Sequence, residues 1–393
     1  MSNVKDIFKR HQAQTFPAPS SLEIKSAKGS YITDINGKEY LDFVAGVSAC
    51  TLGHSNPIVT NAVKQQLEKY THVMVYGEYI QSPQYKLAKL LDENLPDMLS
   101  TTYFTNSGAE AIEGSMKLAK RATGRSEIIS CKDSYHGSTQ GALSIMGNEY
   151  HKAKYRPLLP HCNQIVFNDT DSLNNITKKT AAVVIEPIQG ASGFITLKNN
   201  FLQKVREKCN ETETLLIFDE IQTCFGRLGT LFGFEKYDVI PDVLCIAKGM
   251  GAGMPIGAFI ASWELMNLLT FDPKLGHITT FGGHPINCAA SLACLKYLLT
   301  SDLMKKIERK EQLFRENLNH PRIKEIRGEG LMLAIEFNDE KLAQKVVEQA
   351  LENGLILFYF LFTKTAIRIT PPLTITKDEI IKGCTIIKGI LDA

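Results

Sequence analysis

The sequence predicts an α/β protein with a large domain built on a mainly parallel sheet and a second, smaller α+β domain. From about residue 57, helical patterns alternate with short apolar runs. This order is typical of a parallel sheet covered by helices on both faces. After residue 300 the pattern changes to a charged helix followed by mixed strands and helices. The 393 residues suffice for two domains that each bury a core.

Both chain ends are expected to build the small domain. Residues 1–28 are polar and interrupted by prolines, so we expect an N-terminal arm. Two β-rich runs then flank Asn36-Gly37 within residues 30–43, and Asn-Gly is the strongest short signal for a hairpin. We expect this hairpin to join the C-terminal part of the chain. The predicted units are residues 1–50 (arm and hairpin), 51–295 (large domain) and 296–393 (small domain).

Periodicity and turn residues place the individual elements. The helices of the large domain are expected at 57–70, 82–94, 108–122, 199–210 and 285–299. Its buried strands are expected at 101–105, 127–131, 164–167, 181–186, 214–219, 243–246 and 256–261. The C-terminal part is expected to contain helices at 302–318 and 339–353, strands at 330–337 and 365–370, and an apolar run at 355–362.

Composition and charge exclude several classes of protein. Lys and Arg number 44 against 42 Asp and Glu, a net charge of +2, which leaves no basic field for nucleic acid. The nine cysteines contain no Cys-x-x-Cys pair and favour a reducing compartment over disulfides or zinc. No secretory signal is visible, and the longest apolar run, Leu355–Phe362, is too short to cross a bilayer. We expect a cytoplasmic protein without membrane partners.

The first candidate for chemistry lies at residues 101–121. A β-rich run ends in Asn106-Ser107-Gly108 and passes directly into a helix. Free backbone N–H groups and the helix dipole at such a junction suit a phosphate group, and the Ser107 hydroxyl can add a donor. The alternative is an ordinary helix N-cap, because Ser and Asn are favoured there whatever the function.

The second candidate is the apolar run that delivers Asp219 and Glu220 at its end. Open α/β sheets bind their ligands at this edge. A carboxylate there could hold a metal, orient a histidine or keep a heteroaromatic nitrogen protonated. The alternative is again a helix N-cap.

The third candidate is Lys248, which follows an apolar run and precedes Gly249, Gly251 and Gly253. A partly buried ammonium costs free energy unless it is paired or deprotonated, so such a lysine can act as a Schiff-base nucleophile. The alternative is a surface lysine whose charged end reaches solvent. The glycines follow the lysine and match neither a dinucleotide fingerprint nor a P-loop.

Together the three candidates are more specific than any one of them. A phosphate cradle, a carboxylate and an activated lysine on one α/β sheet predict a pyridoxal 5′-phosphate site. The cradle would take the phosphate, the carboxylate would hold the pyridinium proton and the lysine would form the imine. No metal is required.

The ordered motifs of the chain also resemble a known family. The resemblance runs from about residue 22 to the C-terminus and is to the class III (subgroup II) pyridoxal-phosphate aminotransferases. That group includes the acetylornithine, ornithine and 4-aminobutyrate aminotransferases. The motifs are LGHSNP, FTNSGAEA, DSYHGST, VIEPIQG, FDEIQTCFGRLG, AKGMGAGMPIGA, TTFGGHP and IRITPPL.

The resemblance implies a fold-type I architecture and a homodimer with active sites shared between the subunits. It implies that Lys248 binds the cofactor and shuttles protons, and that Asp219 pairs with the pyridine nitrogen. It also assigns a carboxylate-binding role to Arg368, whose alternative is a strand-surface arginine. The other cofactor contacts that it implies are Ser107, Gly108 and Ala109 at the phosphate, Tyr135 and Ile221 on the ring faces, Gln222 near the 3-hydroxyl and Thr280 from the partner subunit.

Three positions depart from the pattern of these enzymes. Ser138 stands where they typically carry an arginine that grips the distal carboxylate of the donor. Ala191 replaces a glutamate that can pair with the substrate arginine and release it by turns. The stretch around Thr15 lacks the tyrosine of the ornithine enzymes. The catalytic residues are unaffected, but ornithine and 4-aminobutyrate are in doubt as donors.

The sequence therefore predicts an ω-aminotransferase that moves nitrogen from an amino acid or ω-amine to a 2-oxo acid such as 2-oxoglutarate, in two half-reactions. The same residues could support an aminomutase or a decarboxylating transamination. A non-catalytic binding protein on this fold is a remote alternative, since such a protein could lose Lys248 or Asp219 freely.

Overall fold

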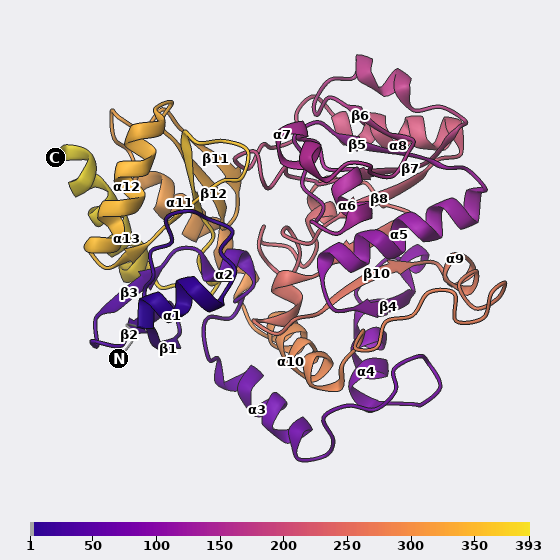
Figure 1. Ribbon diagram of the computed structural model, residues 1–393, viewed down its shortest axis with the longest axis horizontal. Coiled ribbons are helices and arrows are strands. Elements are labelled where there is room, and N and C mark those ends of the chain that lie inside the picture. Colours follow the sequence, from indigo (N-terminus) through magenta and orange to yellow (C-terminus); the bar gives the residue numbers. More distant parts are fainter. Residues whose placement is uncertain (1–3) are drawn as a thin grey trace.

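A computed structural model of the chain describes residues 4–393 and contains one large and two small sheets (Figure 1). The large sheet has seven strands in the order β4-β10-β9-β8-β7-β5-β6. Only β10 runs against the others, because it pairs antiparallel with both β4 and β9. The strands are β4 Thr101–Thr105, β5 Glu127–Cys131, β6 Cys162–Ile165, β7 Thr180–Ile185, β8 Leu215–Asp219, β9 Val243–Ile246 and β10 Gly257–Ala261. The predicted α/β class and the seven predicted strands are confirmed.

Both faces of this sheet are buried, which explains why its strands are continuously apolar. Leu216 and Phe218 of β8 belong to one core cluster, whereas Ile217 between them belongs to another, as expected for side chains that alternate along a strand. The first face packs against α8 Phe201–Thr212 and α10 Pro285–Thr300, and the second against α5 Gly108–Thr123 and α9 Trp263–Asn267. The remaining helices here are α3 Pro57–Leu67, α4 Ser82–Asp92, α6 Gln140–Ser144 and α7 Glu149–Lys152.

The two chain ends meet in a small sheet of order β1-β2-β3-β13. The predicted hairpin forms, and its second strand pairs in parallel with β13, so that Leu41 lies opposite Leu355. The strands are β1 Ile24–Lys28, β2 Tyr31–Asp34, β3 Glu39–Asp42 and β13 Leu355–Ile356. The N-terminal and C-terminal segments thus share one sheet; the exact domain boundaries stay a prediction.

The third sheet has the order β11-β12-β15-β14 and corrects two expectations. The strand expected at 330–337 is β12, the second strand of a hairpin with β11. Gly330, with φ +58, forms the turn between them. The apolar run 355–362 is divided between two sheets. The strands are β11 Glu325–Glu329, β12 Met332–Glu336, β14 Phe358–Tyr359 and β15 Ala366–Ile369, and the helices are α11 Ile307–Asn317, α12 Glu340–Glu352 and α13 Lys377–Asp392.

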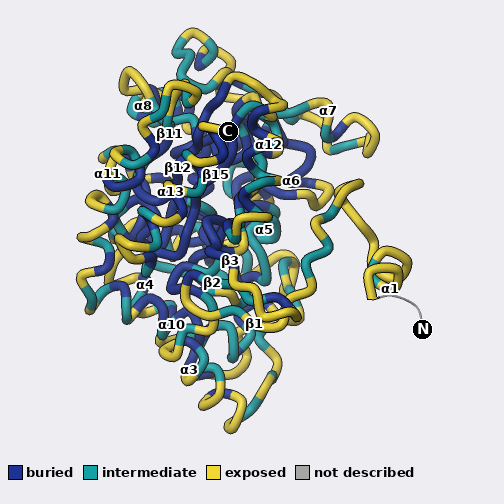
Figure 2. The backbone as a smooth tube through the Cα atoms, turned by 90° about the vertical axis from the view of Figure 1, so that its left-hand side faces the viewer, coloured by how far each residue is buried: buried dark blue, intermediate teal, exposed yellow. Residues whose placement is uncertain are grey.

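The N-terminal arm also differs from expectation. It contains a helix, α1 Val4–His11, none of whose residues is buried, and Figure 2 shows it apart from the body of the protein. The last 5 residues of the segment 1–28 belong to β1, so the arm is shorter than predicted. Within the described residues, no helix has the length and apolar character needed to cross a membrane.

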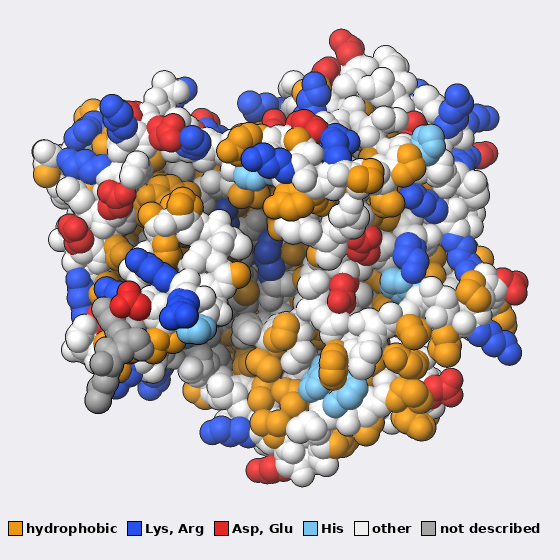
Figure 3. Space-filling model, viewed as in Figure 1, with side chains coloured by type: hydrophobic (Ala, Val, Ile, Leu, Met, Phe, Trp, Pro, Cys, Tyr) orange, Lys and Arg blue, Asp and Glu red, His pale blue; other side chains and the backbone are white. Residues whose placement is uncertain are grey.

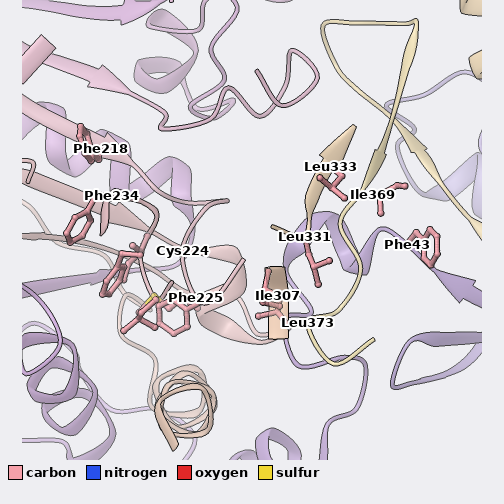
Figure 4. Packing of buried hydrophobic residues seen from close by; sticks show 14 of the residues in the cluster. Phe43, Phe218, Cys224, Phe225, Phe234, Ile307, Leu331, Leu333, Ile369 and Leu373 are labelled. Atoms are coloured by element: carbon pink, nitrogen blue, oxygen red, sulfur yellow. The ribbon is translucent and has the colours of Figure 1, made fainter. Parts of the chain in front are cut away.

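One core cluster continues from the large sheet into the C-terminal part (Figure 4). Phe218 and Phe225 on the large-sheet side and Leu331 and Leu373 on the other side belong to the same cluster of buried residues. Burying a side chain of this size stabilises the fold by about 1.5–3 kcal/mol. The two parts therefore pack through a shared apolar interface.

A left-handed turn, α2 Ala45–Ser48, leads from β3 toward the large sheet. Val47 has φ 59 and ψ 54, a conformation that costs a β-branched residue about 1–2 kcal/mol. The Asp42 carboxylate holds the turn, since Oδ1 accepts from the N–H groups of Val44 at 2.7 Å and Ala45 at 3.0 Å. Oδ2 of the same carboxylate lies 2.8 Å from Nε2 of His54.

The His54–Asp42 pair predicts a pH-dependent contribution to stability. Hydrogen bonds to Asp42 and then to Cys50 raise the pKa of His54 from 6.5 to about 10. Because the folded-state pKa is raised, the pair stabilises most fully below pH 6.5, and the contribution is lost as the pH rises toward 10. The loss of unfolding free energy in His54→Gln, measured by urea titration, is therefore expected to be larger at pH 6 than at pH 10. A loss that grows with pH would contradict this assignment.

Candidate active site

Five parallel strands of the large sheet end at the same edge, and functional side chains follow each of them. Ser107 follows β4, His136 follows β5, Glu186 follows β7, Asp219 ends β8 and Lys248 follows β9. These residues line a cavity of about 440 Å³, at the edge where open α/β sheets bind their ligands. Figure 3 shows the molecule hollowed beside this edge, with basic side chains inside the hollow. The predicted site residues in the lining are Ser107, Gly108, Ala109, Tyr135, Asp219, Ile221, Gln222 and Lys248.

The β4–α5 junction opens the N-terminus of a 16-residue helix into the cavity. Ser107 is the N-cap, and its hydroxyl oxygen accepts from the N–H of Glu110 at 3.2 Å. A Cβ at Gly108 would lie 2.6 Å from Cδ1 of Ile221, so only glycine permits this approach. The capping interpretation is confirmed. Anion binding stays a prediction, which the position of the first-turn N–H groups and the helix dipole at the cavity wall favours.

Asp219 lies at the centre of a buried polar cluster. Its Oδ2 is 2.7 Å from Nδ1 of His136, and its Oδ1 accepts from the N–H of Ile221 at 3.1 Å. Burial lowers the pKa of His136, but the hydrogen bond to Asp219 and the nearby negative charges outweigh this effect and leave the pKa above its usual value. The His136 imidazole and the Asp219 carboxylate thus form a buried hydrogen-bonded pair.

Glu220 takes no part in this cluster although it follows Asp219 directly. Its carboxylate accepts from the N–H groups of Gly233 and Phe234 and from the Thr223 hydroxyl. Burial raises the pKa of Glu220 to about 7. Both carboxylates were candidates in the sequence, but only Asp219 lines the cavity.

A second carboxylate in the cavity comes from Glu186. Its oxygens accept from the N–H of Tyr135 at 3.0 Å and of Gly190 at 2.6 Å. Burial first, and then the charge of Asp219, raise the pKa of Glu186 to about 7, while His136 opposes the shift. Neither His136 nor Glu186 was among the residues predicted from the sequence, although both stand in family motifs: Glu186 is the last residue of the strand predicted at 181–186, and His136 follows the strand predicted at 127–131.

Lys248 begins a short 3-10 turn that follows β9 and has φ 45, a strained backbone for a residue with a side chain. Its ammonium faces the cavity and is otherwise enclosed by protein. Burial lowers the pKa of Lys248, and the positive charge of Arg368 lowers it further, whereas Asp219 and Glu186 act in the opposite direction. The amine is therefore more easily deprotonated than an ordinary surface lysine, which suits a nucleophile and a base.

The other lining residues fix the walls. Nε2 of Gln222 donates to the Ser48 hydroxyl at 3.1 Å, and a Cβ at Gly190 would lie 2.7 Å from the Gln222 side-chain oxygen. The Tyr135 hydroxyl and the Ser138 hydroxyl are 3.1 Å apart. Ser138 and Ala191, two of the positions that depart from the family pattern, both line the cavity, whereas Thr15 lies in the exposed arm.

Arg368 lies on β15, outside the lining residues but close enough for its charge to act on Lys248. Its guanidinium carbon is 4.8 Å from the ring centre of Phe360 and 5.9 Å from that of Phe194. Nε donates to the carbonyl of Tyr359 at 3.1 Å. Burial lowers the pKa of Arg368 to about 10, and no carboxylate among residues 4–393 forms an ion pair with it. A buried guanidinium without a counter-ion is a candidate carboxylate site.

Thr280 is the one predicted cofactor contact that lies away from this cavity. It is exposed in the loop 271–284. The neighbouring Thr279 hydroxyl accepts from Nδ2 of Asn106 at 2.8 Å, so the loop is anchored to the β4–α5 junction. No group of His, Cys, Asp and Glu within the described part of the chain is arranged to hold a metal ion.

Comparison with known proteins gives consistent matches. The family model for aminotransferase class-III matches residues 14–391. An acetylornithine aminotransferase from Methanopyrus kandleri is 37% identical, over 91% of this chain and 90% of the relative. The acetylornithine aminotransferase of Bacillus subtilis is 38% identical, over 93% of this chain and 94% of the relative. Ornithine aminotransferase from Toxoplasma gondii superposes with a TM-score of 0.91 at 31% identity, covering 100% of this chain and 96% of that chain. A transaminase from the marine bacterium Virgibacillus superposes with a TM-score of 0.93 at 26% identity. The match covers 99% of this chain and 98% of that chain.

Proposed function

Because the chain belongs to the class-III aminotransferases, we propose that it transfers the amino group of a carboxylate-bearing ω-amino compound to a 2-oxo acid such as 2-oxoglutarate. Aminotransferase activity and dependence on pyridoxal 5′-phosphate follow from the family, the curated relatives and the solved structures, among them an amine transaminase in its PLP-bound form. The substrate pair and the roles of individual residues are the proposal. It rests chiefly on the unpaired Arg368 guanidinium beside the cavity that holds Lys248 and Asp219.

The cavity fits this cofactor. The α5 N-terminus at Ser107–Ala109 offers first-turn N–H groups for a phosphate. Asp219 offers a carboxylate, hydrogen-bonded to His136, for a ring nitrogen, and Lys248 offers an amine. Ile221 and Tyr135 supply apolar and aromatic walls.

When bound, pyridoxal 5′-phosphate supplies an electron-accepting ring that stabilises negative charge at the reacting carbon of the substrate. Asp219 holds the proton on the ring nitrogen, and His136 positions that carboxylate. Nζ of Lys248 takes the proton from the reacting carbon of the donor and later returns one, a role favoured by its lowered pKa. Arg368 binds the substrate carboxylate through two parallel N–H donors and so orients the reacting end.

The Asp219 role makes a direct prediction. Asp219→Asn keeps the shape but removes the negative charge, so we expect turnover to fall by about 10²–10⁴-fold and the pKa of His136 to fall as well. Single-turnover kinetics and the NMR titration of His136 check these two effects. The matched control is Glu220→Gln at the adjacent carboxylate, which points away from the cavity. Similar losses in both variants would indicate a general effect of buried charge.

The amino donor is tested by a half-reaction screen. The cofactor-loaded enzyme is mixed with acetylornithine, ornithine, 4-aminobutyrate and butylamine, and the visible spectrum is followed. 4-Aminobutyrate and butylamine differ mainly in the carboxylate, so 4-aminobutyrate is expected to have a higher kcat/KM than butylamine. This expectation holds whether or not acetylornithine reacts faster than either of them. Equal reactivity of these two compounds would contradict a carboxylate-bearing donor.

The aminomutase and decarboxylating alternatives are separated by stoichiometry. An aminotransferase consumes one 2-oxo acid per donor and releases no CO₂. An aminomutase needs no net 2-oxo acid, and a decarboxylating enzyme releases CO₂ with each donor consumed. Measurement of both quantities in one reaction distinguishes the three.

We further propose a homodimer in which Thr280 lies at the cofactor phosphate of the partner subunit. The supporting feature is an exposed apolar surface, here called the loop face, formed by residues 71–81 and 271–284. Ile80 is 93% and Phe281 53% exposed. The two segments contact each other, since the His72 ring centre lies 4.8 Å from that of Phe281. Contiguous exposed apolar patches of this kind mark association surfaces.

Charge placed on the loop face is expected to dissociate the dimer. In sedimentation experiments the wild type is expected at about twice the 43.7 kDa chain mass, and Phe281→Asp largely as monomer with weakened cofactor binding. Tyr155→Asp, at an exposed aromatic outside the loop face, is the control. A wild-type protein that sediments as a monomer and still transaminates would contradict the shared site.

A further inference from the structure

The cavity wall contains a second buried carboxylate besides Asp219, that of Glu186. Glu186 is 6% exposed and follows β7, the strand that lies between β5 and β8 in the large sheet. Its two oxygens have separate donors, since Oε1 accepts from the N–H of Tyr135 at 3.0 Å and Oε2 from the N–H of Gly190 at 2.6 Å. One side chain thus holds the backbone of two segments that lie far apart in the sequence.

The first of these bonds fixes a segment that faces the candidate cofactor site. Tyr135 lines the cavity, and Nδ1 of the next residue, His136, lies 2.7 Å from Oδ2 of Asp219. The Tyr135 hydroxyl is 3.1 Å from that of Ser138, which also lines the cavity. The bond between Glu186 and the Tyr135 N–H therefore holds the aromatic wall of the cavity, and the imidazole beside it, in one position.

The second bond closes a tight loop, residues 186–195. The Gly190 N–H turns back to the carboxylate, and the backbones of Gln189 and Ile195 exchange two hydrogen bonds of 3.0 and 3.3 Å. A Cβ at Gly190 would lie 2.7 Å from the side-chain oxygen of Gln222, so Gln222 packs directly on this backbone. A displaced Gly190 would therefore move Gln222 as well.

The far end of the 186–195 loop supports the candidate carboxylate site. Phe194 belongs to the loop, and its ring packs edge-on against that of Phe360, with the ring centres 4.7 Å apart. The guanidinium carbon of Arg368 lies 5.9 Å from the Phe194 centre and 4.8 Å from the Phe360 centre. The loop that begins at Glu186 thus ends at the aromatic rings that hold Arg368.

Among side chains of this length, only a carboxylate can make both bonds of Glu186. An amide has one acceptor and one donor group, so glutamine would turn its NH₂ toward one of the two N–H donors. The acid is costly at this position, because burial and then the charge of Asp219 raise its pKa. The presence of two N–H donors, Tyr135 and Gly190, accounts for an acid there.

We propose that Glu186 is a positioning residue of the transamination site, which fixes Tyr135 beside the cofactor and the 186–195 loop against Arg368. This role rests on the proposed function, which assigns Tyr135 to the cofactor and Arg368 to the substrate carboxylate. Groups that are already held in place need not be ordered on binding, which strengthens binding and aligns the reacting atoms. Loss of either bond is therefore expected to loosen the cofactor and weaken carboxylate binding.

Hydrogen exchange of the two bound amides tests these contacts without relying on catalysis. The holoenzyme of Glu186→Gln is placed in D₂O, and peptides that cover residues 132–139 and 187–195 are followed by mass spectrometry. Because glutamine can keep only one of the two bonds, we expect deuterium uptake in at least one of these peptides to become at least 10-fold faster than in the wild type.

The matched control is Glu220→Gln. Glu220 is also a buried carboxylate with two backbone donors, the N–H groups of Gly233 and Phe234, but it lies outside the cavity lining. Faster exchange around these two residues, with cofactor binding as in the wild type, is the expected result. Glu186→Asp is the second variant, since it keeps the charge and both acceptors but is one methylene too short to reach both donors.

Cofactor binding and substrate kinetics test the consequence of the contacts. In Glu186→Gln the release of pyridoxal 5′-phosphate, followed by gel filtration, is expected to be at least 10-fold faster, and the visible circular dichroism of the bound cofactor weaker. With the cofactor in excess, kcat should fall for both 4-aminobutyrate and butylamine, whereas KM should rise at least 5-fold for 4-aminobutyrate only. A purely structural role of Glu186 would not produce this difference between the two amines.

A folded Glu186→Gln or Glu186→Asp whose amide exchange, cofactor release and kinetics match the wild type would overturn the proposal. Losses no larger than those of Glu220→Gln, or equal changes of KM for the two amines, would overturn it as well. If the wild type reacts with neither amine, the proposed function fails, while amide exchange and cofactor release still decide the role of Glu186. Should neither variant fold, rapid exchange of the Tyr135 and Gly190 amides in the wild-type holoenzyme overturns the proposal, and slow exchange supports it.

Discussion

Lys248→Ala is expected to abolish the visible absorbance that the bound cofactor owes to its covalent bond with a lysine, and to lower turnover by at least about 10²–10⁴-fold. The amine lies at the end of β9, enclosed by protein and facing the cavity, with its pKa lowered chiefly by burial. At neutral pH a larger fraction is therefore unprotonated than in a surface lysine, and this unprotonated form is both nucleophile and base. Alanine supplies neither function.

Absorption spectra and single-turnover rates of purified enzyme check this prediction. The matched control is Lys310→Ala. Burial lowers the pKa of Lys310 to about 8, but its ammonium donates to the carbonyl of Leu373, away from the cavity. The control should keep the wild-type spectrum. An unchanged visible spectrum in Lys248→Ala would exclude Lys248 as the cofactor lysine.

Arg368→Ala is expected to raise KM for the carboxylate substrate while leaving cofactor affinity nearly unchanged. Truncating one partner of a buried, hydrogen-bonded charge pair costs about 2–5 kcal/mol, which corresponds to about a 30-fold to several-thousand-fold loss of kcat/KM. The guanidinium is held by the Tyr359 carbonyl and by the rings of Phe194 and Phe360. Its remaining N–H donors are thus aimed by packing before the substrate arrives.

Two comparisons separate this role from a structural one. Arg368→Lys keeps the charge but loses the paired donors, so we expect an intermediate KM. Arg327→Lys, on a nearby strand with its guanidinium 2.9 Å from Glu336, is the control and should behave as wild type. The loss in Arg368→Ala should affect 4-aminobutyrate and spare butylamine. An equal loss for both amines would remove Arg368 from the carboxylate site.

The large sheet could be predicted because its strands carry the signal of full burial. β7 is buried at all six positions, and such runs occur where helices cover both faces. The chemistry at their ends could be located for the same reason, since parallel strands bring Ser107, Asp219 and Lys248 to one edge. The C-terminal helix α13 was not among the predicted elements, although the capping box at Thr376 and Glu379 is a start signal visible in the sequence.

Other parts of the site depend on which strands become neighbours. His136 and Asp219 are 83 positions apart and meet because β5, β7 and β8 are consecutive in the sheet. Glu186 joins them from the strand between. No local pattern distinguishes these residues from ordinary loop histidines and glutamates. Strand order is set by the packing of the whole sheet, so it cannot be predicted from local residue patterns.

The sequence by itself determined the reaction chemistry of this protein, because the lysine, the carboxylate and the helix N-terminus are fixed by local residue order. Only the tertiary structure decided that Asp219 faces the cavity while Glu220 turns to the 233–234 backbone. It also decided that β3 pairs with β13 and that His54 meets the buried carboxylate of Asp42. The physical reason is that local propensity acts over a few residues, whereas side-chain direction, burial and charge environment depend on segments far apart in the chain.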